Sequence, residues 1–525
     1  MRGYQAILMV AVAAWSAAEG LAQQQKSAVA AAKTAASEDG LAMTPPMGWY
    51  PWNQFGQGPQ NETLIKQTAD ALVTSGMREA GYSYVGPDEG ICFFRNDNNG
   101  QLATNLKRYP SGLRGLGDYI HKKGLKYALY TDAGTHTCSK AMPGTKDHEQ
   151  DDMRTFAEWR CDYLKIDWCN TKGQDVVKTY TTLREAQLAA GRPVVHALCT
   201  WGGGQPWKWA AAIGHLWRTT EDICGPGRAN WGKAMQIAFA NQRLYRHAGP
   251  GHWNDPDMMI TGMRGLSEAQ NRSFFSLWCI MAAPLIAGND LRSMSKSTVE
   301  ILTNLEAIAV NQDPLGKQGH VVRKDGKVSI WAGKPLYDGS QAILAFNQGT
   351  EPADVQIKWV DVGLNEKAEL YARNLWMHET TGPHAGGLSV NVAPNDVAMF
   401  RISKNNAFPI PPIISADSYL VTFRTGDGTT AQSLSKAIRI TDKGTNALPA
   451  WKVTPNLPDW LDVAVVRDGQ VQTVTCTVST AGLEKGLHHA LVRLDNKEPV
   501  SGRPLSAFYF DVDLEVAQDV RDGHR

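Results

Sequence analysis

The amino-acid sequence predicts an α/β fold: a (β/α)8 TIM barrel followed by an antiparallel β-sandwich domain and a further all-β, immunoglobulin-like domain. Strand-like runs alternate with helical ones from residue 43 to about residue 318. After Pro314 the runs become short, alternating and separated by turn residues. No Gly-x-Gly-x-x-Gly motif follows the first run, which argues against a dinucleotide-binding sheet. The 525 residues are enough for two or three domains.

Eight strand-like runs define the predicted barrel over residues 43–318. They are residues 48–52, 82–85, 126–131, 163–166, 193–199, 215–218, 251–253 and 284–288. Amphipathic segments between them, such as 62–80, 112–123 and 175–190, predict helices. Eight strand–helix units within about 275 residues are the usual size of one (β/α)8 barrel.

Two all-β domains are predicted after the barrel. Runs at 328–332, 341–347, 353–359 and 397–402 predict an antiparallel β-sandwich over residues 319–404. A proline-rich hinge at 408–412 leads to an immunoglobulin-like domain over residues 413–516, where 471–478 and 488–494 alternate clearly. We expect this last domain to act as a spacer or a glycan-attachment module. Residues 517–525 are polar and are expected to form a tail.

The amino-terminal sequence and the charge balance indicate an exported protein with a neutral partner. Residues 1–22 combine Arg2, an apolar run at 6–14 and a small-residue ending, which predicts a secretory signal peptide. The apolar run is too short to span a bilayer, so we expect no stable membrane insertion. Residues 23–42 are interpreted as a linker. The 53 basic and 52 acidic residues nearly balance, so the chain lacks the excess of positive charge that is typical of nucleic-acid binding. We expect a periplasmic or secreted protein.

The eight cysteines predict disulfide chemistry rather than a metal site. There is no Cys-x-x-Cys pair and no His-Glu-x-x-His motif, so neither a metal nor a cofactor is expected. Cys138 and Cys169 lie beside the third and fourth strand ends and are the first disulfide candidates. Cys199 with Cys224 is a weaker candidate pair. The remaining cysteines are equally compatible with buried thiols; they are Cys92, Cys161, Cys279 and Cys476.

Charged side chains at two strand ends point to catalysis. In residues 163–169, alternation places Lys165 and Asp167 on the same side of a strand that is otherwise apolar. A second run, residues 216–223, ends in Asp222. Catalytic groups of barrel enzymes gather at the carboxyl ends of the strands. Two carboxylates placed in this way are what a glycosidase needs, one as nucleophile and one as proton donor.

The other strand ends carry groups that suit a sugar. In chain order they are Trp49, Asp88, Glu89, Tyr130, Asp132, Lys165, Asp167, Thr200, Trp201, Arg218, Asp222, Asp255 and Asp257. Carboxylates and cations hydrogen-bond hydroxyl groups, and indole faces stack on the C–H surface of a pyranose. We therefore expect a sugar pocket that Trp49, Trp168, Trp201 and Trp253 also line.

Six motifs resemble the α-galactosidase (melibiase) family of retaining glycoside hydrolases, glycoside hydrolase family 27. They lie at residues 44–49, 163–169, 217–223, 250–258, 284–290 and 311–316. The resemblance covers about residues 43–318, and the following β domain also fits. The family also contains α-N-acetylgalactosaminidases and β-L-arabinopyranosidases.

The resemblance implies roles for individual residues. Asp167 would be the nucleophile and Asp222 the acid/base of a double displacement, with their carboxyl groups about 5–5.5 Å apart. We expect Lys165 to keep Asp167 ionised, and burial or Glu221 to keep Asp222 protonated. The residues that fall on the family's pocket positions are Trp49, Asp88, Tyr130, Lys165, Arg218 and Asp257. Two of them have simpler readings, Asp257 as a turn cap and Tyr130 as barrel packing.

Two departures from the family pattern bear on the substrate. Glu89 stands where the family has a second aspartate, and its extra methylene moves the carboxylate roughly 1.5 Å toward the space of the C6 hydroxymethyl group. L-arabinopyranose lacks that group. Thr200 stands where α-galactosidases commonly have glutamate, so contact with the 2-hydroxyl is expected to be weaker or water-mediated.

The sequence therefore predicts a retaining exo-glycosidase that releases terminal α-D-galactose. A β-L-arabinopyranosidase is the first alternative because of Glu89, and an α-N-acetylgalactosaminidase is the second. The alternative from another class is a carbohydrate-binding protein on an inactive barrel. That alternative is disfavoured because both Asp167 and Asp222 are present.

Overall fold

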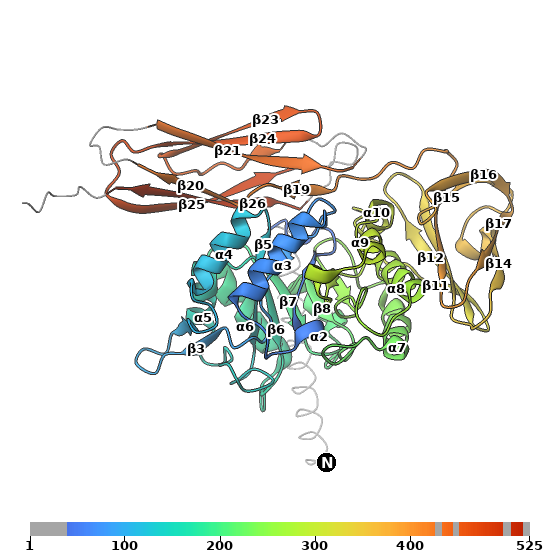
Figure 1. Ribbon diagram of the computed structural model, residues 1–525, viewed down its shortest axis with the longest axis horizontal. Helices are drawn as coiled ribbons and strands as arrows, with labels where there is room; N and C mark the ends of the chain where they lie inside the picture. Colours follow the sequence, from blue (N-terminus) through green and yellow to red (C-terminus); the bar gives the residue numbers. More distant parts are fainter. Residues whose placement is uncertain (1–38, 426–432, 445–450, 497–505, 518–525) are drawn as a thin grey trace, which may run out of the picture.

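The computed structural model describes residues 39–425, 433–444, 451–496 and 506–517 (Figure 1). The predicted signal peptide, the linker before residue 39 and the tail after residue 517 lie outside the described residues. Among the helices in the described part of the chain, none combines the length and the apolar character needed to cross a membrane.

Eight parallel strands form the first domain. Their order around the sheet is β10-β1-β2-β5-β6-β7-β8-β9. Met259, just after β9, makes a parallel bridge to Ala287 in β10, and this bridge closes the ring. The bounds are β1 Met47–Trp49, β2 Tyr84–Val85, β5 Lys126–Asp132, β6 Tyr163–Asp167, β7 Val195–Cys199, β8 Leu216–Arg218, β9 Trp253–Asp255 and β10 Leu285–Ala287.

Helices surround this ring of strands (Figure 1). They are α2 Trp52–Phe55, α3 Glu62–Thr74, α4 Gly112–Lys122, α5 Glu149–Glu158, α6 Val176–Ala189, α7 Trp231–Asn241, α8 Glu268–Ile280, α9 Lys296–Leu302 and α10 Leu305–Asn311. Asn61 and Asp175 cap α3 and α6, their side chains accepting from the backbone N–H of Leu64 and Lys178. A short hairpin, β3 Phe93–Arg95 with β4 Leu102–Thr104, was not predicted.

One strand–helix unit differs from the prediction. Between β7 and β8 the chain forms only two short 3₁₀ turns, Pro206–Lys208 and Ala210–Ala212. Three consecutive glycines at 202–204 precede these turns, and Pro206 begins the first of them. Glycine and proline are the two weakest helix formers, so a full helix is not favoured here.

The amino-terminal end of the barrel is filled by aromatic side chains and by residues 39–42. The rings of Tyr50 and Tyr84 both pack against Tyr163, with centroids 5.7 and 5.2 Å away. The indole N–H of Trp253 donates to the carbonyl of Ala42 at 2.7 Å. This end is therefore closed, which leaves the carboxyl ends of the strands for a site.

The second domain is a β-sandwich. One sheet has the order β11-β12-β13-β18-β15-β16, and β14 pairs with β17. The bounds are β11 His320–Asp325, β12 Val328–Pro335, β13 Gln341–Asn347, β14 Ala353–Lys358, β15 Glu369–Asn374, β16 Glu379–Ala385, β17 Gly387–Val392 and β18 Val397–Ser403. Apolar side chains such as Ile343, Val355 and Trp359 form its core. An ion pair between Arg272 of α8 and Asp396 joins it to the barrel.

The third domain packs two four-stranded sheets on each other, and it lies across one end of the barrel (Figure 1). Their orders are β19-β21-β24-β23 and β20-β26-β25-β22, and among the described strands of this domain only the β20–β26 pair is parallel. The bounds are β19 Ile414–Ala416, β20 Leu420–Arg424, β21 Ser433–Asp442, β22 Lys452–Val453, β23 Leu461–Asp468, β24 Val471–Ser479, β25 Gly486–Asp495 and β26 Phe508–Val516. The predicted fold class, a (β/α) barrel followed by antiparallel β domains, is confirmed.

Candidate active site

A cavity opens at the carboxyl ends of the barrel strands. Its lining residues are Trp52, Asn53, Asp88, Glu89, Tyr130, Cys138, Lys165, Asp167, Trp201, Arg218, Asp222, Asp257 and Met258. The structure thus brings together most of the residues predicted for the sugar pocket. Those that do not line this cavity are Trp49, Asp132, Trp168, Thr200, Trp253 and Asp255. Segments separated by up to about 200 residues of sequence meet here because parallel strands end at the same face of the barrel.

Asp167 ends β6 and is held from one side. The hydroxyl of Tyr130 donates to Oδ2 at 2.7 Å, while Oδ1 is buried and has no hydrogen-bond partner among the described residues. Burial raises the pKa of Asp167, and the charge of Lys165 offsets this only in part. Asp167 lines the cavity, and one of its carboxylate oxygens is left without a hydrogen-bond partner in the described part of the chain, as a nucleophile requires.

Lys165 and Asp88 form a charged pair beside Asp167. The ammonium of Lys165 lies 3.0 Å from Oδ2 of Asp88 and 5.2 Å from the centre of the Tyr130 ring. Burial alone would lower the pKa of Lys165, but Asp88 and Asp167 together raise it well above its usual value. Lys165 therefore keeps a positive charge within the cavity.

Arg218 is shared between two carboxylates. One guanidinium nitrogen lies 3.0 Å from Oδ1 of Asp222 and 3.1 Å from Oδ2 of Asp257. Burial raises the pKa of Asp257. Oδ2 of Asp257 also accepts from the backbone N–H of Ile223 at 2.7 Å, one residue after Asp222. Asp257 therefore fixes both Arg218 and the segment that carries Asp222.

The expectation that burial or Glu221 keeps Asp222 protonated is wrong for the free protein. The side chain of Asp222 is 51% exposed, and that of Glu221 is 84% exposed, 3.7 Å from Lys233. Partial burial would raise the pKa of Asp222, but the charge of Arg218 outweighs it and the pKa lies below its usual range.

Two lining residues have unusual backbone conformations. Asp257 has a φ of 89° and Trp201 a φ of 50°. For residues other than glycine, such conformations cost about 1–3 kcal/mol and cluster at functional sites. Both residues follow the ends of strands, where the strain turns their side chains into the cavity.

Glu89 reaches the loop that follows β5. Its Oε1 accepts from both the backbone N–H and the hydroxyl of Ser139, at 2.8 and 2.6 Å. Gln57 in turn donates to the Ser139 hydroxyl at 2.6 Å. The extra methylene of Glu89 therefore spans the distance to this loop, and one carboxylate oxygen is occupied. Ser139 was not predicted; its position next to Cys138 was the available signal.

The predicted disulfide between Cys138 and Cys169 is confirmed. Cys138 Sγ lies 3.5 Å from Oδ2 of Asp167, so the disulfide forms part of the cavity wall. Gly134 lets the loop approach closely, because a Cβ there would lie 2.0 Å from the carbonyl oxygen of Cys169.

The suggested pairing of Cys199 with Cys224 is wrong, because both are free, buried thiols. Cys199 ends β7, inside the barrel, whereas Cys224 follows the turn after Asp222. The other cysteines are also buried thiols; they are Cys92, Cys161, Cys279 and Cys476.

Some predicted aromatic positions lie elsewhere. Trp49 is fully buried and donates to the carbonyl of Asn289 at 2.7 Å, whereas Trp253 lies at the closed end of the barrel. Trp168 stacks on Tyr180. Thr200 is buried, and its hydroxyl has no hydrogen-bond partner among the described residues. The roles predicted for Trp49 and Thr200 therefore stay predictions.

The residues that sequence reasoning missed lie next to motifs it used. Trp52 and Asn53 follow the first strand, and Met258 follows Asp257. One group of potential metal ligands is found among the described residues, Asp132 with Cys138 and Cys169. Its two sulfur atoms are joined in the disulfide, so they are not available as thiolate ligands.

Comparisons with known proteins agree with this geometry. Residues 44–313 match the protein family described as Alpha galactosidase A, and residues 325–402 match the Alpha galactosidase C-terminal beta sandwich domain. An α-galactosidase of Oryza sativa subsp. japonica is 44% identical over 374 residues, which are 71% of this chain and 88% of the relative. Alpha-galactosidase 2 of Arabidopsis thaliana is 44% identical over 369 residues, 70% of this chain and 92% of that protein.

Solved structures give the same result. The crystal structure of α-galactosidase I from Mortierella vinacea matches with a TM-score of 0.66 at 29% identity, covering 69% of this chain and 98% of that one. The family match spans more than half of the chain, and the two plant relatives are covered almost completely. The chain therefore belongs to the α-galactosidase (melibiase) family of glycoside hydrolases.

Proposed function

We propose that the protein is a retaining exo-α-galactosidase, which releases terminal α-D-galactose from oligo- or polysaccharides. The observation that carries this proposal is one cavity in which Asp167 presents a free oxygen and Asp222 stands beside Arg218. The plant relatives named Alpha-galactosidase, each 44% identical, support the choice of galactose. No cofactor is needed for this chemistry.

In the first step, Oδ1 of Asp167 attacks the anomeric carbon. Asp222 gives a proton to the departing glycosidic oxygen, and a covalent galactosyl-enzyme forms. The Tyr130 hydroxyl holds the other oxygen of Asp167, which fixes the direction of attack. Lys165 and Asp88 offer a donor and an acceptor to sugar hydroxyls at the same wall.

Asp222 must carry a proton in this step, although Arg218 favours its anion in the free protein. A bound sugar excludes water and offers hydroxyl groups to Arg218. Both effects would raise the pKa of Asp222 toward the value that a general acid needs. In the second step Asp222 removes a proton from water, which hydrolyses the intermediate with overall retention.

A β-L-arabinopyranosidase is the second candidate, and Glu89 favours it. Its carboxylate stands at the wall predicted to face the C6 group, tied to Ser139. An α-N-acetylgalactosaminidase is less favoured, since only one feature supports it: Thr200 is shorter than the glutamate common at this position in α-galactosidases.

We also propose that the protein acts outside the cytoplasm, in the periplasm or as a secreted enzyme. The signal-like residues 1–22 and the disulfide support this location.

The proposal is tested with p-nitrophenyl α-D-galactopyranoside and p-nitrophenyl β-L-arabinopyranoside. We expect the galactoside to have the higher kcat/KM, and NMR of the fresh product to show α-D-galactose. Asp167→Asn should lower kcat by about three orders of magnitude or more. In a second variant, Asp222→Ala, added azide should restore turnover and give galactosyl azide as the product. Release of the β anomer, or full activity of Asp167→Asn, would contradict the mechanism.

A further inference from the structure

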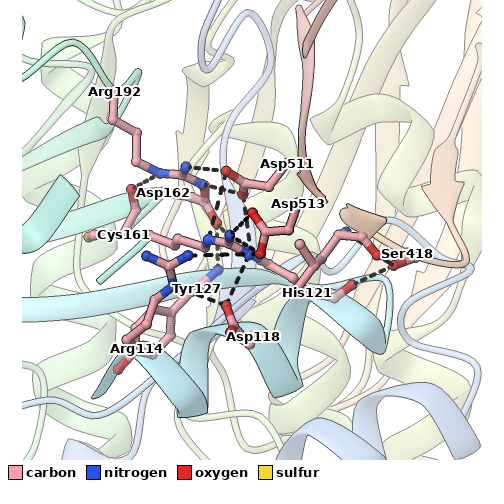
Figure 2. A network of polar contacts seen from close by, with 12 residues as sticks. Arg114, Asp118, His121, Tyr127, Cys161, Asp162, Arg192, Ser418, Asp511 and Asp513 are labelled. Carbon is pink, nitrogen blue, oxygen red and sulfur yellow. Dashed lines mark hydrogen bonds and ion pairs between the residues drawn. The ribbon is translucent and has the colours of Figure 1, made fainter. Parts of the chain in front are cut away.

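The third domain docks on the closed, amino-terminal end of the barrel. The sheet that contains β20, β25 and β26 faces the barrel, where it meets α4, the loop before β6 and the loop before β7 (Figures 1 and 2). Nothing about the sugar site requires a domain at this face, which lies opposite the cavity. The contacts there are charged and buried, and they were not predicted.

Two arginines of the barrel carry the docking. Arg192 lies 2.9 Å from Oδ1 of Asp511 in β26 and 2.6 Å from Oδ1 of Asp162 in the barrel. Arg160 pairs with Asp513 in β26 and, at 3.0 Å, with Asp118 in α4.

These charges are hidden from water. The side chains of Arg160 and Asp511 are each 1% exposed, and that of Arg192 is 8% exposed. A buried charge is stable only with a partner. Each arginine has one carboxylate partner within the barrel and at least one on the third domain, so neither half of the chain supplies all of these partners alone.

His121, at the end of α4, joins the same network (Figure 2). Its Nε2 lies 2.6 Å from Oδ2 of Asp162, and its Nδ1 lies 3.5 Å from Oδ2 of Asp511. The backbone carbonyl of His121 accepts from the N–H of Tyr419 in the third domain at 2.8 Å. The docking is thus fixed by backbone as well as by charge.

The third domain also holds residues 39–43 against the barrel. The backbone N–H of Ala507 donates to the carbonyl of Gly40 at 2.7 Å, and the hydroxyl of Tyr509 donates to the carbonyl of Asp39 at 2.8 Å. From the other side, Arg184 and His215 of the barrel contact the Asp39 carboxylate at 2.8 and 3.1 Å. This segment is therefore enclosed between the two domains.

The same network touches the strands that carry the site. Asp162 immediately precedes β6, and its Oδ2 accepts from the backbone N–H of Tyr127 in β5 at 2.8 Å. The opposite ends of these two strands carry Tyr130 and Asp167. The docking contacts therefore fix the start of both strands whose ends form the cavity wall.

We propose that the third domain is a structural closure of the barrel, which folds and unfolds with it as one unit and protects the site against inactivation. It is not an independent spacer on a flexible hinge. A spacer would not share buried charges with the barrel, whereas Arg160 and Arg192 each divide their charge between a barrel carboxylate and carboxylates of β26.

The test uses the full chain with a specific protease site inserted between Asn405 and Asn406, in the exposed stretch just before the hinge. After cleavage at neutral pH, we expect the third domain and the remainder to elute together in gel filtration. We also expect calorimetry of the uncut chain to show barrel and third domain unfolding in one transition. Separation of the fragments with an unchanged temperature of half-inactivation would overturn the proposal.

Substitutions identify the contacts responsible. In the cleavable chain, Asp511→Asn combined with Asp513→Asn should release the third domain and lower the temperature of half-inactivation by several degrees. Glu515→Gln is the matched control, because Glu515 lies on the same strand and its pair with Arg424 is exposed. Continued co-elution of the double variant would refute the role of the buried pairs. Co-elution of the cut wild type is measured without a substitution and without a substrate. Its outcome therefore does not depend on whether the proposed activity is correct.

Discussion

At the scale of single residues, the sharing of Arg218 influences the pKa of Asp222, the proposed acid/base. Asp222 and Asp257 compete for one guanidinium nitrogen, and more distant cations add to its effect on Asp222. The pKa of the acid/base is therefore set by a sum of charges around it. Any change in that sum moves the alkaline limb of the pH profile, because this limb reports the loss of the proton from the general acid.

We predict that Lys233→Met moves the alkaline limb of kcat, which reports groups in the enzyme–substrate complex, to higher pH. Lys233 lowers the pKa of Asp222 through its charge, so removing the charge raises that pKa. The side chain is partly exposed, so the shift should be small, roughly half a pH unit or less, and should fade with added salt. The measurement is the pH profile at low ionic strength. Lys296→Met, at a lysine that is 91% exposed, is the control; a shift toward lower pH would contradict the assignment.

Ser139 should influence the choice of sugar through Glu89. Ser139→Ala removes one of two donors that hold Glu89 to the loop, which frees the carboxylate to turn toward the sugar. We expect the ratio of kcat/KM for the α-galactoside over the β-L-arabinopyranoside to fall by about tenfold. Glu89→Asp, too short to reach Ser139, should raise the ratio. If both variants keep the wild-type ratio in the nitrophenyl assay, this wall does not select the sugar.

At the scale of elements, the disulfide holds the loop after β5 against the site. Cys138 touches Asp167, and the next residue holds Glu89. We predict that Cys138→Ser with Cys169→Ser lowers the free energy of unfolding by about 2–4 kcal/mol. The expected loss of kcat/KM follows from a looser loop. Urea unfolding measures the first effect, and the wild type under reducing conditions is the control, because it loses the same bond without any substitution. An unchanged urea midpoint would mean that the loop is held by its other contacts.

The elements were predictable where a local pattern decides them. Alternation located β13 at its observed bounds, and strand ends with paired charges located Lys165 and Asp167. Trp253 was misplaced because it begins its strand rather than ends it, and the two positions look alike in a run of three residues. The short hairpin β3–β4 carries too few residues for a pattern.

Long-range pairing was beyond the sequence. Arg192 and Asp511 are 319 positions apart, and Arg160 and Asp513 are 353 apart. Charged residues are usually exposed, so sequence reasoning places them on the surface. The hydrogen bond between Glu89 and Ser139 could not be predicted for a related reason. It depends on the folded position of the loop that carries Ser139, which the sequence does not give.

At the scale of the whole molecule, the docking pairs make the protein sensitive to acid. Burial would raise the pKa of Asp511 and Asp513, but their cations outweigh it; the pKa of Asp511 is lowered and that of Asp513 falls to about 2. A carboxylate with a lower pKa in the folded state stabilises that state fully above its unfolded pKa of about 4. This stability is then lost as the pH falls from about 4 toward 2.

We therefore predict that the melting temperature falls steeply below about pH 4. Calorimetry between pH 7 and pH 2 measures it. Asp511→Asn with Asp513→Asn should have a lower melting temperature at pH 7 and a shallower dependence on acid, because these groups no longer titrate. Asp118, Asp162, His121 and His489 face the same pairs, and Asp162, whose pKa is also lowered, keeps part of the dependence. A double variant that follows the wild-type curve in parallel would show that other groups dominate.

The buried arginine pairs also limit how this chain can be recombined with its relatives. A chimera that transplants residues 413–517 beneath another barrel would bury Asp511 and Asp513 against whatever that barrel presents. Without arginines at the places of Arg160 and Arg192, Asp511 and Asp513 would keep only His489 of their own domain as a partner, and each lost buried pair would cost up to about 3–5 kcal/mol. A transplanted third domain therefore requires the two arginines on the barrel that receives it as well as its own fold.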